Sequence, residues 1–273
     1  MKEVWNTRIE PGRILGNLYF VGTHPASSHL IDTGDGLILI DTGYPDTLYL
    51  VVQSIWELGF RPENIRYILH SHGHFDHCGA TAPLQKLTGA KTLIGAGDED
   101  YVNGKLDLTW AKELGYRYEY PFEADIVLHD GDHVRLGNTD ILCISTPGHT
   151  PGTLSFFFDI EDGGKVYRAG MQGGGGVNSM TRDFLLRYGL SFDCRQDFLN
   201  GIARLREEHV DVTLGNHVWN NDTNGKLARV KAGERTAFVD PAFWQKNLDG
   251  LEKALADMLA AEAQAELNQE GML

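Results

Sequence analysis

The sequence predicts an α/β fold in which two β-sheets lie face to face and helices cover their outer sides. Short runs rich in β-branched and aromatic residues, separated by turn residues, form two groups, at 14–41 and 125–169. Apolar residues between and after these groups recur at helical spacing. A length of 273 residues with 42% hydrophobic content suits one domain over 1–273 with a substantial core.

The first strand group leads into an expected helix and then into a buried strand. Three strands are expected within 14–41, split by turn signals such as Gly34-Asp35-Gly36. Asp46 is the expected N-cap of a helix over 46–58, because apolar residues follow it at helical spacing. A buried strand over 67–69 then delivers a histidine-rich segment, and a strand at 91–95 resumes the sheet.

The second half repeats this alternation and ends in a long helix. Strands are expected at 125–128, 133–136, 139–145, 153–160, 165–169 and 210–214, and a helix at about 193–208. Asp240 as N-cap and Pro241 at the first position open a C-terminal helix over 240–265, expected to fray after about residue 262. Residues 96–122 show no clean period.

The most distinctive stretch is HSHGHFDHCG, residues 70–79, in which four histidines and one aspartate fall within eight positions. Neutral imidazole is the commonest metal ligand in proteins, and a carboxylate adds an oxygen donor. Alternate positions of an extended segment point the same way, so His72 and His74 can converge on one ion. Asp76 and His77 are displaced from that pair and can begin a second site. The pattern favours a metal centre over a polar surface loop.

Two later histidines are the best candidates to complete these sites. His149 lies in STPGHTPGT, where proline and glycine can hold a side chain rigidly at a strand end. His217 lies in LGNHVWNND, directly after an apolar run. His70 either contacts the ligand residues without binding metal itself, or it is simply the last residue of the strand. The remaining histidines lack converging partners and are expected to be solvated or structural: His24, His29, His129, His133 and His209.

These motifs together resemble the metallo-β-lactamase superfamily. The resemblance is carried by HGHFDH at 72–77, TPGHTPG around His149 and the late His217, and it covers about residues 15–220. It implies a four-layer αββα sandwich and two zinc ions, although other divalent metals remain open. One ion is held by His72, His74 and His149, and the other by Asp76, His77 and His217.

The segment GMQGGGGVN at 170–178 departs from much of that superfamily. Many members place here an aspartate that bridges both metals, and one β-lactamase subclass places a cysteine ligand nearby. This chain has neither, and it is closest in pattern to the third subclass, whose second zinc site is Asp-His-His. Members of that subclass usually carry a serine-bearing segment here. The run 173–176 is either a flexible wall that a substrate approaches closely or a solvent loop.

The resemblance implies a β-lactamase-like hydrolase. A metal-bound hydroxide would cleave an amide or ester bond of a small molecule, β-lactams included, with Asp76 both a ligand and catalytic. The alternatives are a hydrolase of the same fold that acts on a lactone or thioester, and a non-catalytic metal-binding protein.

Residues beside the expected ligands have open roles. Asp41 either orients the histidine loop by hydrogen bonds, as the resemblance implies, or caps a turn. Trp219, Asn220 and Asn221 follow His217 closely, and they either touch substrate or pack on the surface.

Composition bounds the partners. A formal charge of −14 argues against a nucleic-acid partner. The sequence has no run of 18 apolar residues, so no membrane span is expected. The N-terminus lacks the apolar core of a signal peptide, so a cytoplasmic protein is expected unless a leader has been trimmed. Three cysteines form no disulfide framework, and Cys78 is expected to be a buried thiol. Nothing in the sequence fixes the oligomeric state.

Overall fold

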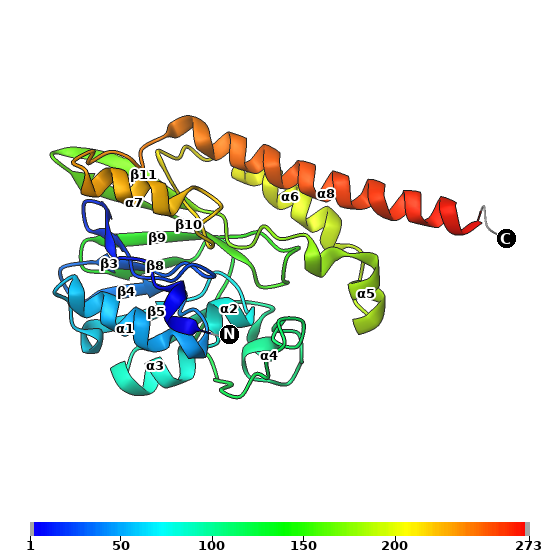
Figure 1. Ribbon diagram of the computed structural model, residues 1–273, viewed down its shortest axis with the longest axis horizontal. Helices are drawn as coiled ribbons and strands as arrows, with labels where there is room; N and C mark the ends of the chain where they lie inside the picture. Colours follow the sequence, from blue (N-terminus) through cyan, green and yellow to red (C-terminus); the bar gives the residue numbers. More distant parts are fainter. Residues whose placement is uncertain (1–2, 271–273) are drawn as a thin grey trace.

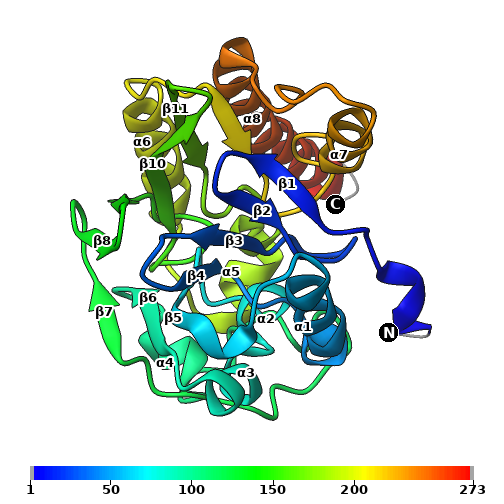
Figure 2. The same cartoon turned by 90° about the vertical axis from the view of Figure 1, so that its left-hand side faces the viewer.

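The computed structural model describes residues 3–270 and shows two β-sheets packed face to face, with helices on the outer side of each (Figures 1 and 2). The first sheet has the order β1-β2-β3-β4-β5-β6-β7, and the second has the order β12-β11-β10-β9-β8. The expected αββα sandwich is therefore confirmed.

The first sheet is antiparallel from β1 to β4 and parallel from β4 to β7. Its strands are β1 (Gly12–Leu15), β2 (Leu18–Phe20), β3 (His29–Asp32), β4 (Leu37–Ile40), β5 (Ile65–Leu69), β6 (Lys91–Gly95) and β7 (Ile126–Leu128). Helices α1 (Leu48–Glu57) and α3 (Thr81–Thr88) cover its outer side (Figure 1). Because β4, β5 and β6 are parallel, their carboxyl ends meet at one edge.

The second sheet is antiparallel except for the parallel pair β11 and β12. Its strands are β8 (His133–Leu136), β9 (Thr139–Ser145), β10 (Leu154–Asp162), β11 (Lys165–Met171) and β12 (Val212–Leu214). Helices α6 (Cys194–Leu205) and α8 (Pro241–Glu270) pack on its outer side, and α7 (Thr223–Lys231) lies beside β1 (Figures 1 and 2).

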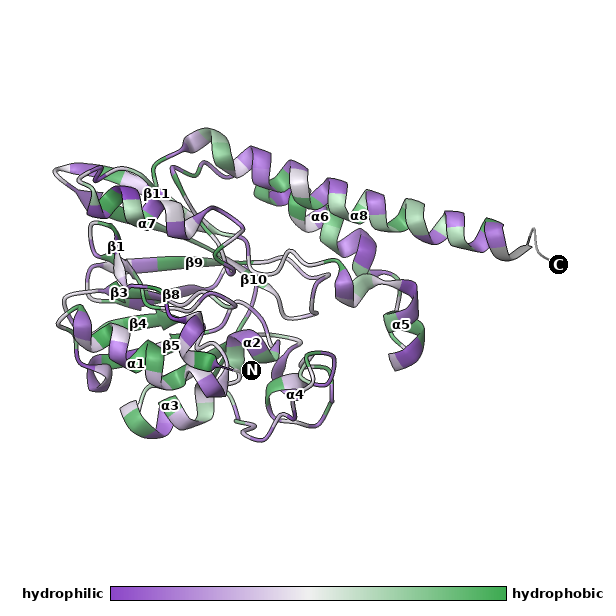
Figure 3. Ribbon diagram, viewed as in Figure 1, coloured by the Kyte–Doolittle hydropathy of each residue, from purple (hydrophilic) through white to green (hydrophobic). Residues whose placement is uncertain are grey.

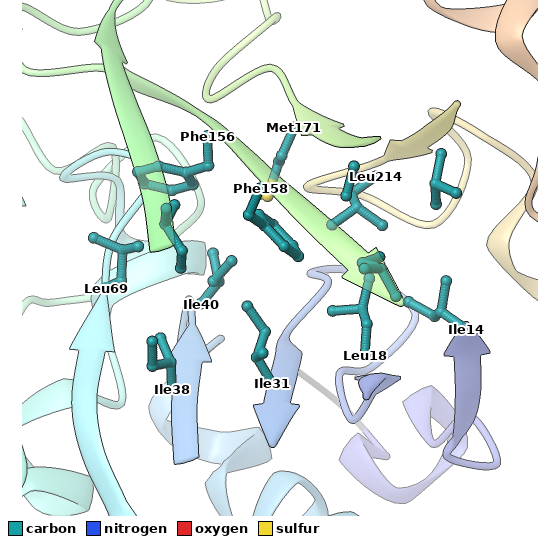
Figure 4. Close-up of a cluster of buried hydrophobic side chains, with 14 of the residues drawn as sticks. Ile14, Leu18, Ile31, Ile38, Ile40, Leu69, Phe156, Phe158, Met171 and Leu214 are labelled. Carbon is teal, nitrogen blue, oxygen red and sulfur yellow. The ribbon is translucent and has the colours of Figure 1, made fainter. Parts of the chain in front are cut away.

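The main core lies between the two sheets. Ile31, Ile38, Ile40 and Leu69 of the first sheet face Phe156, Phe158, Met171 and Leu214 of the second (Figure 4). Successive side chains of a strand point to opposite faces, so Leu37 and Leu39 instead pack toward α1. Strand β4 is thus apolar throughout because both of its faces are buried.

Shorter elements fill the connections. They are the helices α2 (Phe75–Cys78), α4 (Glu99–Val102) and α5 (Arg182–Tyr188), and the 3-10 turns η1 (Val4–Thr7), η2 (Pro45–Thr47), η3 (Pro62–Asn64) and η4 (Asn178–Met180). Residues 96–122, which lack a period, contain only α4 and loops.

The helix expected over 46–58 begins differently from the prediction. Asp46 lies inside η2, and Thr47 occupies the N-cap position of α1. Pro45 opens the 3-10 turn, which the Thr47 hydroxyl closes by donating to the Tyr44 carbonyl at 3.0 Å.

The C-terminal helix is longer than the predicted 240–265 and remains helical beyond residue 262. Asp240 is a side-chain cap as expected, because its Oδ1 accepts from the Ala242 amide at 3.2 Å. Glu262 pairs with Arg195 at 2.7 Å and Glu266 pairs with Arg182, which ties the later turns to α5 and α6. Within residues 3–270, no helix is long and apolar enough to span a bilayer, and α8 alternates hydrophilic and hydrophobic residues (Figure 3).

Trp244 anchors α8 on the second sheet and gives a test of this packing. Its side chain is 1% exposed, its indole donates to the Leu205 carbonyl at 2.9 Å, and its ring meets Phe157 edge-on. We expect Trp244→Ala to lower the free energy of unfolding by about 3–5 kcal/mol, measured in a denaturant titration. Trp56→Ala, at a tryptophan that is 55% exposed, should cost only about 0.5 kcal/mol. Equal losses would contradict this account.

Candidate metal centre

The predicted ligands come from three loops that meet at one end of the sandwich. The loop after β5 carries His72, His74, Asp76 and His77, and α2 forms within it. The turn between β9 and β10 carries His149, and the loop after β12 brings His217. These loops converge because the carboxyl ends of β5, β9 and β12 lie at the same edge of the two packed sheets.

The first group consists of His72, His74 and His149. Their ring centroids lie 4.4–4.8 Å apart in edge-to-face pairs, and all three side chains are buried. One ring nitrogen of each lies within 4.8 Å of the others. Three imidazoles that converge in this way form a candidate three-nitrogen metal site.

The second group lies beside the first and consists of Asp76, His77 and His217. The Oδ2 atom of Asp76 is 3.3 Å from Nε2 of His77 and 3.7 Å from Nε2 of His217. The rings of His72 and His77 are 4.4 Å apart, so the two groups share a boundary.

Hydrogen bonds fix which ring nitrogen faces each group. Nδ1 of His72 lies 2.9 Å from the Gly173 carbonyl, Nδ1 of His149 lies 2.6 Å from the Gly176 carbonyl, and Nδ1 of His217 lies 2.7 Å from the Pro25 carbonyl. A carbonyl only accepts, so each Nδ1 carries the proton and Nε2 keeps its lone pair.

One of these inward-facing atoms tests whether a metal fits. Nε2 of His72 is buried without a hydrogen-bond partner. Buried polar atoms nearly always have a partner, so this atom needs an explanation. A metal ion would supply the missing partner. Nε2 of His77 makes no hydrogen bond either, but it lies beside the Asp76 carboxylate.

Burial keeps the first group neutral. Burial and the neighbouring imidazoles hold the pKa values of His72 and His74 well below the usual value, and burial lowers the pKa of His149 to about 4. At neutral pH these rings are unprotonated, as metal ligation requires.

The second group differs because two carboxylates face His77. Burial lowers the pKa of His77, but the charges of Asp76 and Asp41 outweigh it and raise the pKa to about 10. Burial raises the pKa of Asp76, but His77 and His217 together hold that pKa below its usual range. In the metal-free protein His77 therefore carries a proton that a metal must displace.

Asp41 ties the end of β4 to the histidine loop. Its carboxylate accepts from the Ser71 amide at 2.8 Å, from the Ser71 hydroxyl at 2.7 Å and from Nδ1 of His77 at 2.9 Å. Its φ of 58° is unusual for a residue other than glycine. Of the two interpretations, these contacts favour the orienting role over turn capping.

Asp98 is a supporting residue that the sequence analysis missed. It is buried and accepts from the Gly73 amide, the Gly152 amide and the Thr150 hydroxyl, each at 2.7 Å. It thereby joins the His72–His74 segment to the His149 turn. Its only signal in the sequence is its position three residues after the strand at 91–95, in a region without a period.

The start of the glycine run forms a wall of the site. Gly173 and Gly174 are buried, and the Gly173 carbonyl also accepts from the Asn216 amide group at 2.8 Å. A Cβ on Gly174 would lie 2.5 Å from Cδ2 of His149, and one on Gly173 would lie 2.0 Å from the Leu154 carbonyl oxygen. These contacts favour the wall over the solvent loop for Gly173 and Gly174, whereas Gly176 is exposed.

The other candidates divide into two kinds. Trp219 and Asn220 line the cleft, where the Trp219 ring stacks on His217 at 4.4 Å and Asn220 accepts from the His217 amide at 2.8 Å. Asn221 is buried and holds the Thr213 carbonyl and the Thr223 hydroxyl. Both ring nitrogens of His70 are engaged away from the groups, by the Leu93 carbonyl and the Thr81 hydroxyl.

The remaining histidines and Cys78 stay outside both groups. In the described part of the chain, neither metal-binding group includes His24, His29, His129, His133, His209 or Cys78. Cys78 is a buried thiol beside the Gly73 carbonyl.

A cleft of about 500 Å³ opens over the two groups. Aromatic side chains flank it, among them Tyr44, Trp110 and Trp219. Trp110 has a φ of 65°, and its ring lies 5.8 Å from His74 and 4.7 Å from Phe184. The arrangement provides a floor of convergent ligands and a pocket of small-molecule size.

Gly174→Ala tests the glycine wall. The added methyl group must displace the His149 ring, so we expect zinc affinity of the three-histidine group to fall about tenfold or more. Zinc titration followed by elemental analysis would measure this loss. Gly250→Ala, on an open face of α8, is the matched control and should leave zinc binding unchanged. Unaltered affinity in Gly174→Ala would contradict the proposed contact.

Proton release on zinc binding tests the charge of His77. At pH 6 the second group should release about one proton on filling, and the three-histidine group almost none, because its rings are already neutral. Calorimetry in buffers of different ionisation enthalpy measures the release. The His217→Ala variant should bind one zinc ion and release no proton. Wild type should also bind a second zinc ion, more weakly, and release about one proton as it binds. Affinity for that second zinc should rise with pH from 6 to 8. Equal release at both sites would refute the assignment.

Comparison with known proteins places the chain in a family. Residues 21–163 match the profile of the metallo-beta-lactamase superfamily. The subclass B3 metallo-β-lactamase BJP-1 of Bradyrhizobium japonicum is 28% identical with a TM-score of 0.87, covering 96% of this chain and 98% of that one. FEZ-1 from Legionella gormanii is 30% identical with a TM-score of 0.86, covering 94% and 98%. LRA-12, a class B3 di-zinc enzyme from an Alaskan soil metagenome, is 27% identical with a TM-score of 0.83, covering 94% and 97%.

Curated relatives with other activities are also similar. An N-acyl homoserine lactonase of Bacillus thuringiensis is 27% identical over 190 residues, which covers 59% of this chain and 66% of the lactonase. The chain thus spans just under two thirds of that relative. The superfamily profile, by contrast, matches more than half of the 273 residues, and whole-length structural neighbours share the fold. This chain belongs to the metallo-β-lactamase superfamily.

Proposed function

We propose that the protein is a di-zinc hydrolase that cleaves an amide or ester bond of a small molecule. The observation that carries this proposal is the pair of adjacent three-ligand groups on the floor of the cleft. Three protein ligands leave a position open for water or substrate, as a catalytic zinc requires, whereas structural zinc sites are closed by four. This count favours catalysis over a purely metal-binding role.

His72, His74 and His149 would hold one zinc, and Asp76, His77 and His217 would hold the other. Together the two groups offer five imidazoles and one carboxylate. Such ligands suit zinc better than magnesium or calcium, which prefer oxygen ligands. Asp76 is the one carboxylate among the six, and its Oδ2 faces His77 and His217, so no further carboxylate joins the two groups and the second ion should bind more weakly. Bound zinc lowers the pKa of a water ligand to about 7 and polarises a carbonyl group.

Asp76 would act both as a ligand and on the attacking water. One oxygen, Oδ2, faces His77 and His217, and the low pKa of the carboxyl keeps it ionised and able to accept a hydrogen bond from that water. Asp41 and Asp98 would act through the histidines, by holding the His77 ring and the two ligand-bearing loops in place. Orientation of this kind is the contribution that the protein makes to metal-assisted hydrolysis.

Two substrate classes follow from the relatives. The subclass B3 structural neighbours favour a β-lactam amide. The lactonase relatives, and a hydroxyacylglutathione hydrolase of Anaeromyxobacter dehalogenans that is 31% identical over 46% of this chain and 40% of that enzyme, favour a lactone or thioester. Water attacks a carbonyl carbon in each case, and the leaving atom is nitrogen, oxygen or sulfur.

Zinc loading and Asp76→Asn test this proposal together. Protein purified without chelator should contain about two zinc ions per chain and should hydrolyse a chromogenic β-lactam, a lactone or a thioester. Chelation should abolish turnover, and added zinc should restore it. Asp76→Asn should keep the fold, measured by circular dichroism, but lower kcat about 100-fold. Asp159→Asn, at an exposed aspartate outside the cleft, is the control. No zinc bound on reconstitution, or full activity in Asp76→Asn, would overturn the proposal.

A further inference from the structure

A second cavity, of about 450 Å³, lies where α4, α5 and the start of α6 meet. Within residues 3–270, it shares only His74 and His149 with the lining of the metal cleft, so these two rings form a wall between the two spaces. Trp110 lines the cleft and Phe184 lines the cavity, and their ring centroids lie 4.7 Å apart. A cavity of this size can hold a small molecule, and the proposed hydrolysis does not use it.

The inner part of this cavity is apolar. It is lined by buried or half-buried side chains, which are Tyr101, Leu108, Phe184, Leu185 and Leu190. Four of them belong to one packed cluster, and Leu185 lies beside it on α5. Such walls bind an aromatic ring or a hydrocarbon chain because they remove its surface from water.

Hydrogen bonds hold the floor of the cavity in place. The Ser179 hydroxyl donates to the His149 carbonyl at 2.7 Å, and the Thr150 hydroxyl donates to Asp98 at 2.7 Å. Ser179, Thr150 and His149 all line the cavity and are buried. The floor is therefore preformed, as ligand sites usually are.

One polar atom inside the cavity lacks a partner. Tyr101 is 6% exposed, and its hydroxyl makes no hydrogen bond with any residue in the described part of the chain. A buried tyrosine hydroxyl usually has a partner. Burial raises the pKa of Tyr101, so the hydroxyl stays protonated and can both donate and accept. A ligand with a polar group can supply the missing bond.

The mouth of the cavity is acidic. Its exposed lining residues come from the segment that leads into α6 and from the first turn of that helix, and they include Asp193 and Asp197. Two carboxylates attract a cation, and the formal charge of −14 on the whole chain acts in the same direction. Both carboxylates also complement the positive end of α6, so a test must separate these two roles.

We propose that this cavity is a second ligand site, which binds a small apolar amine with its ring or chain inside and its ammonium group at the mouth, beside Asp193 and Asp197. The inference goes beyond the proposed hydrolysis, because this ligand neither enters the metal cleft nor reacts. An ammonium group at the mouth keeps part of its hydration, so no charge is carried into the apolar interior. Zinc held by His74 and His149 would lie beside the floor, where the apolar end of the ligand is expected.

Cys194 provides a reporter for this site. The chain has three cysteines, and Cys78 and Cys143 are both 0% exposed, whereas Cys194 is partly exposed and lines the cavity. A maleimide should therefore modify Cys194 alone, and a bound ligand should slow that reaction. The probes are naphthylethylamine, naphthylethanol and naphthylpropanoate, added to the zinc-loaded protein. We expect the amine to protect Cys194 at about fivefold lower concentration than the alcohol, and the carboxylate to protect least. Salt should weaken only the protection by the amine.

Two variants test the two ends of the site. Leu190→Trp should fill the inner part and abolish protection by both the amine and the alcohol, whereas Leu186→Trp, at a leucine of α5 that is 60% exposed, should leave it unchanged. Asp193→Asn combined with Asp197→Asn should remove the advantage of the amine and leave protection by the alcohol as it is. Asp159→Asn combined with Asp257→Asn removes the same charge at exposed positions outside the cavity and is the control. Circular dichroism checks the fold of each variant.

Calorimetry with the same three probes measures binding directly and serves as well if no thiol reacts. Binding of the amine to wild type but not to Leu190→Trp would support the proposal. Absence of binding by all three probes, or equal binding to wild type and Leu190→Trp, would overturn it. Equal affinity for the amine and the alcohol would overturn it too, because the carboxylates would then serve only α6. These readouts require no turnover, so a failure of the proposed hydrolysis leaves them unaffected.

Discussion

Apolar packing between the two sheets is the constraint on which the site depends. None of the six proposed ligands lies inside a strand, yet each follows or precedes a strand that is locked into the inter-sheet core. Leu69, Leu154 and Leu214 belong to that core, and the ligand-bearing loops start or end directly beside them. The core therefore positions imidazoles that lie far apart in the sequence, without contacting any metal itself.

Backbone carbonyls do much of the orienting in this centre. Three of the five imidazoles donate to main-chain oxygens, those of Gly173, Gly176 and Pro25. A substitution does not remove a main-chain carbonyl. The side chains at these positions matter instead, because they must be small enough for the backbone to approach the histidines. The glycine run shows this clearly, because a side chain at Gly173 or Gly174 would collide with β10 or with His149.

The sequence reveals the parts of this protein that local chemistry dictates. The two-sheet fold follows from strand patterning, and the converging imidazoles follow from HGHFDH and the later histidines. What escaped prediction depends on contacts distant in the chain. Asp98 gains its role only by meeting Gly152, 54 positions away, and the end of α8 is held by arginines from α5 and α6. In the sequence Asp46 resembles an N-cap, but in the structure Pro45 begins a 3-10 turn that contains Asp46.

The glycine wall also limits how this protein can evolve. A carboxylate that reached the metal groups from the end of β11 would need a side chain there, but Gly173 lies against the Leu154 carbonyl and Gly174 against His149. A bridging carboxylate at either position would require β10 or the His149 turn to move away first. Tighter binding of the second metal would have to arise elsewhere in the cleft.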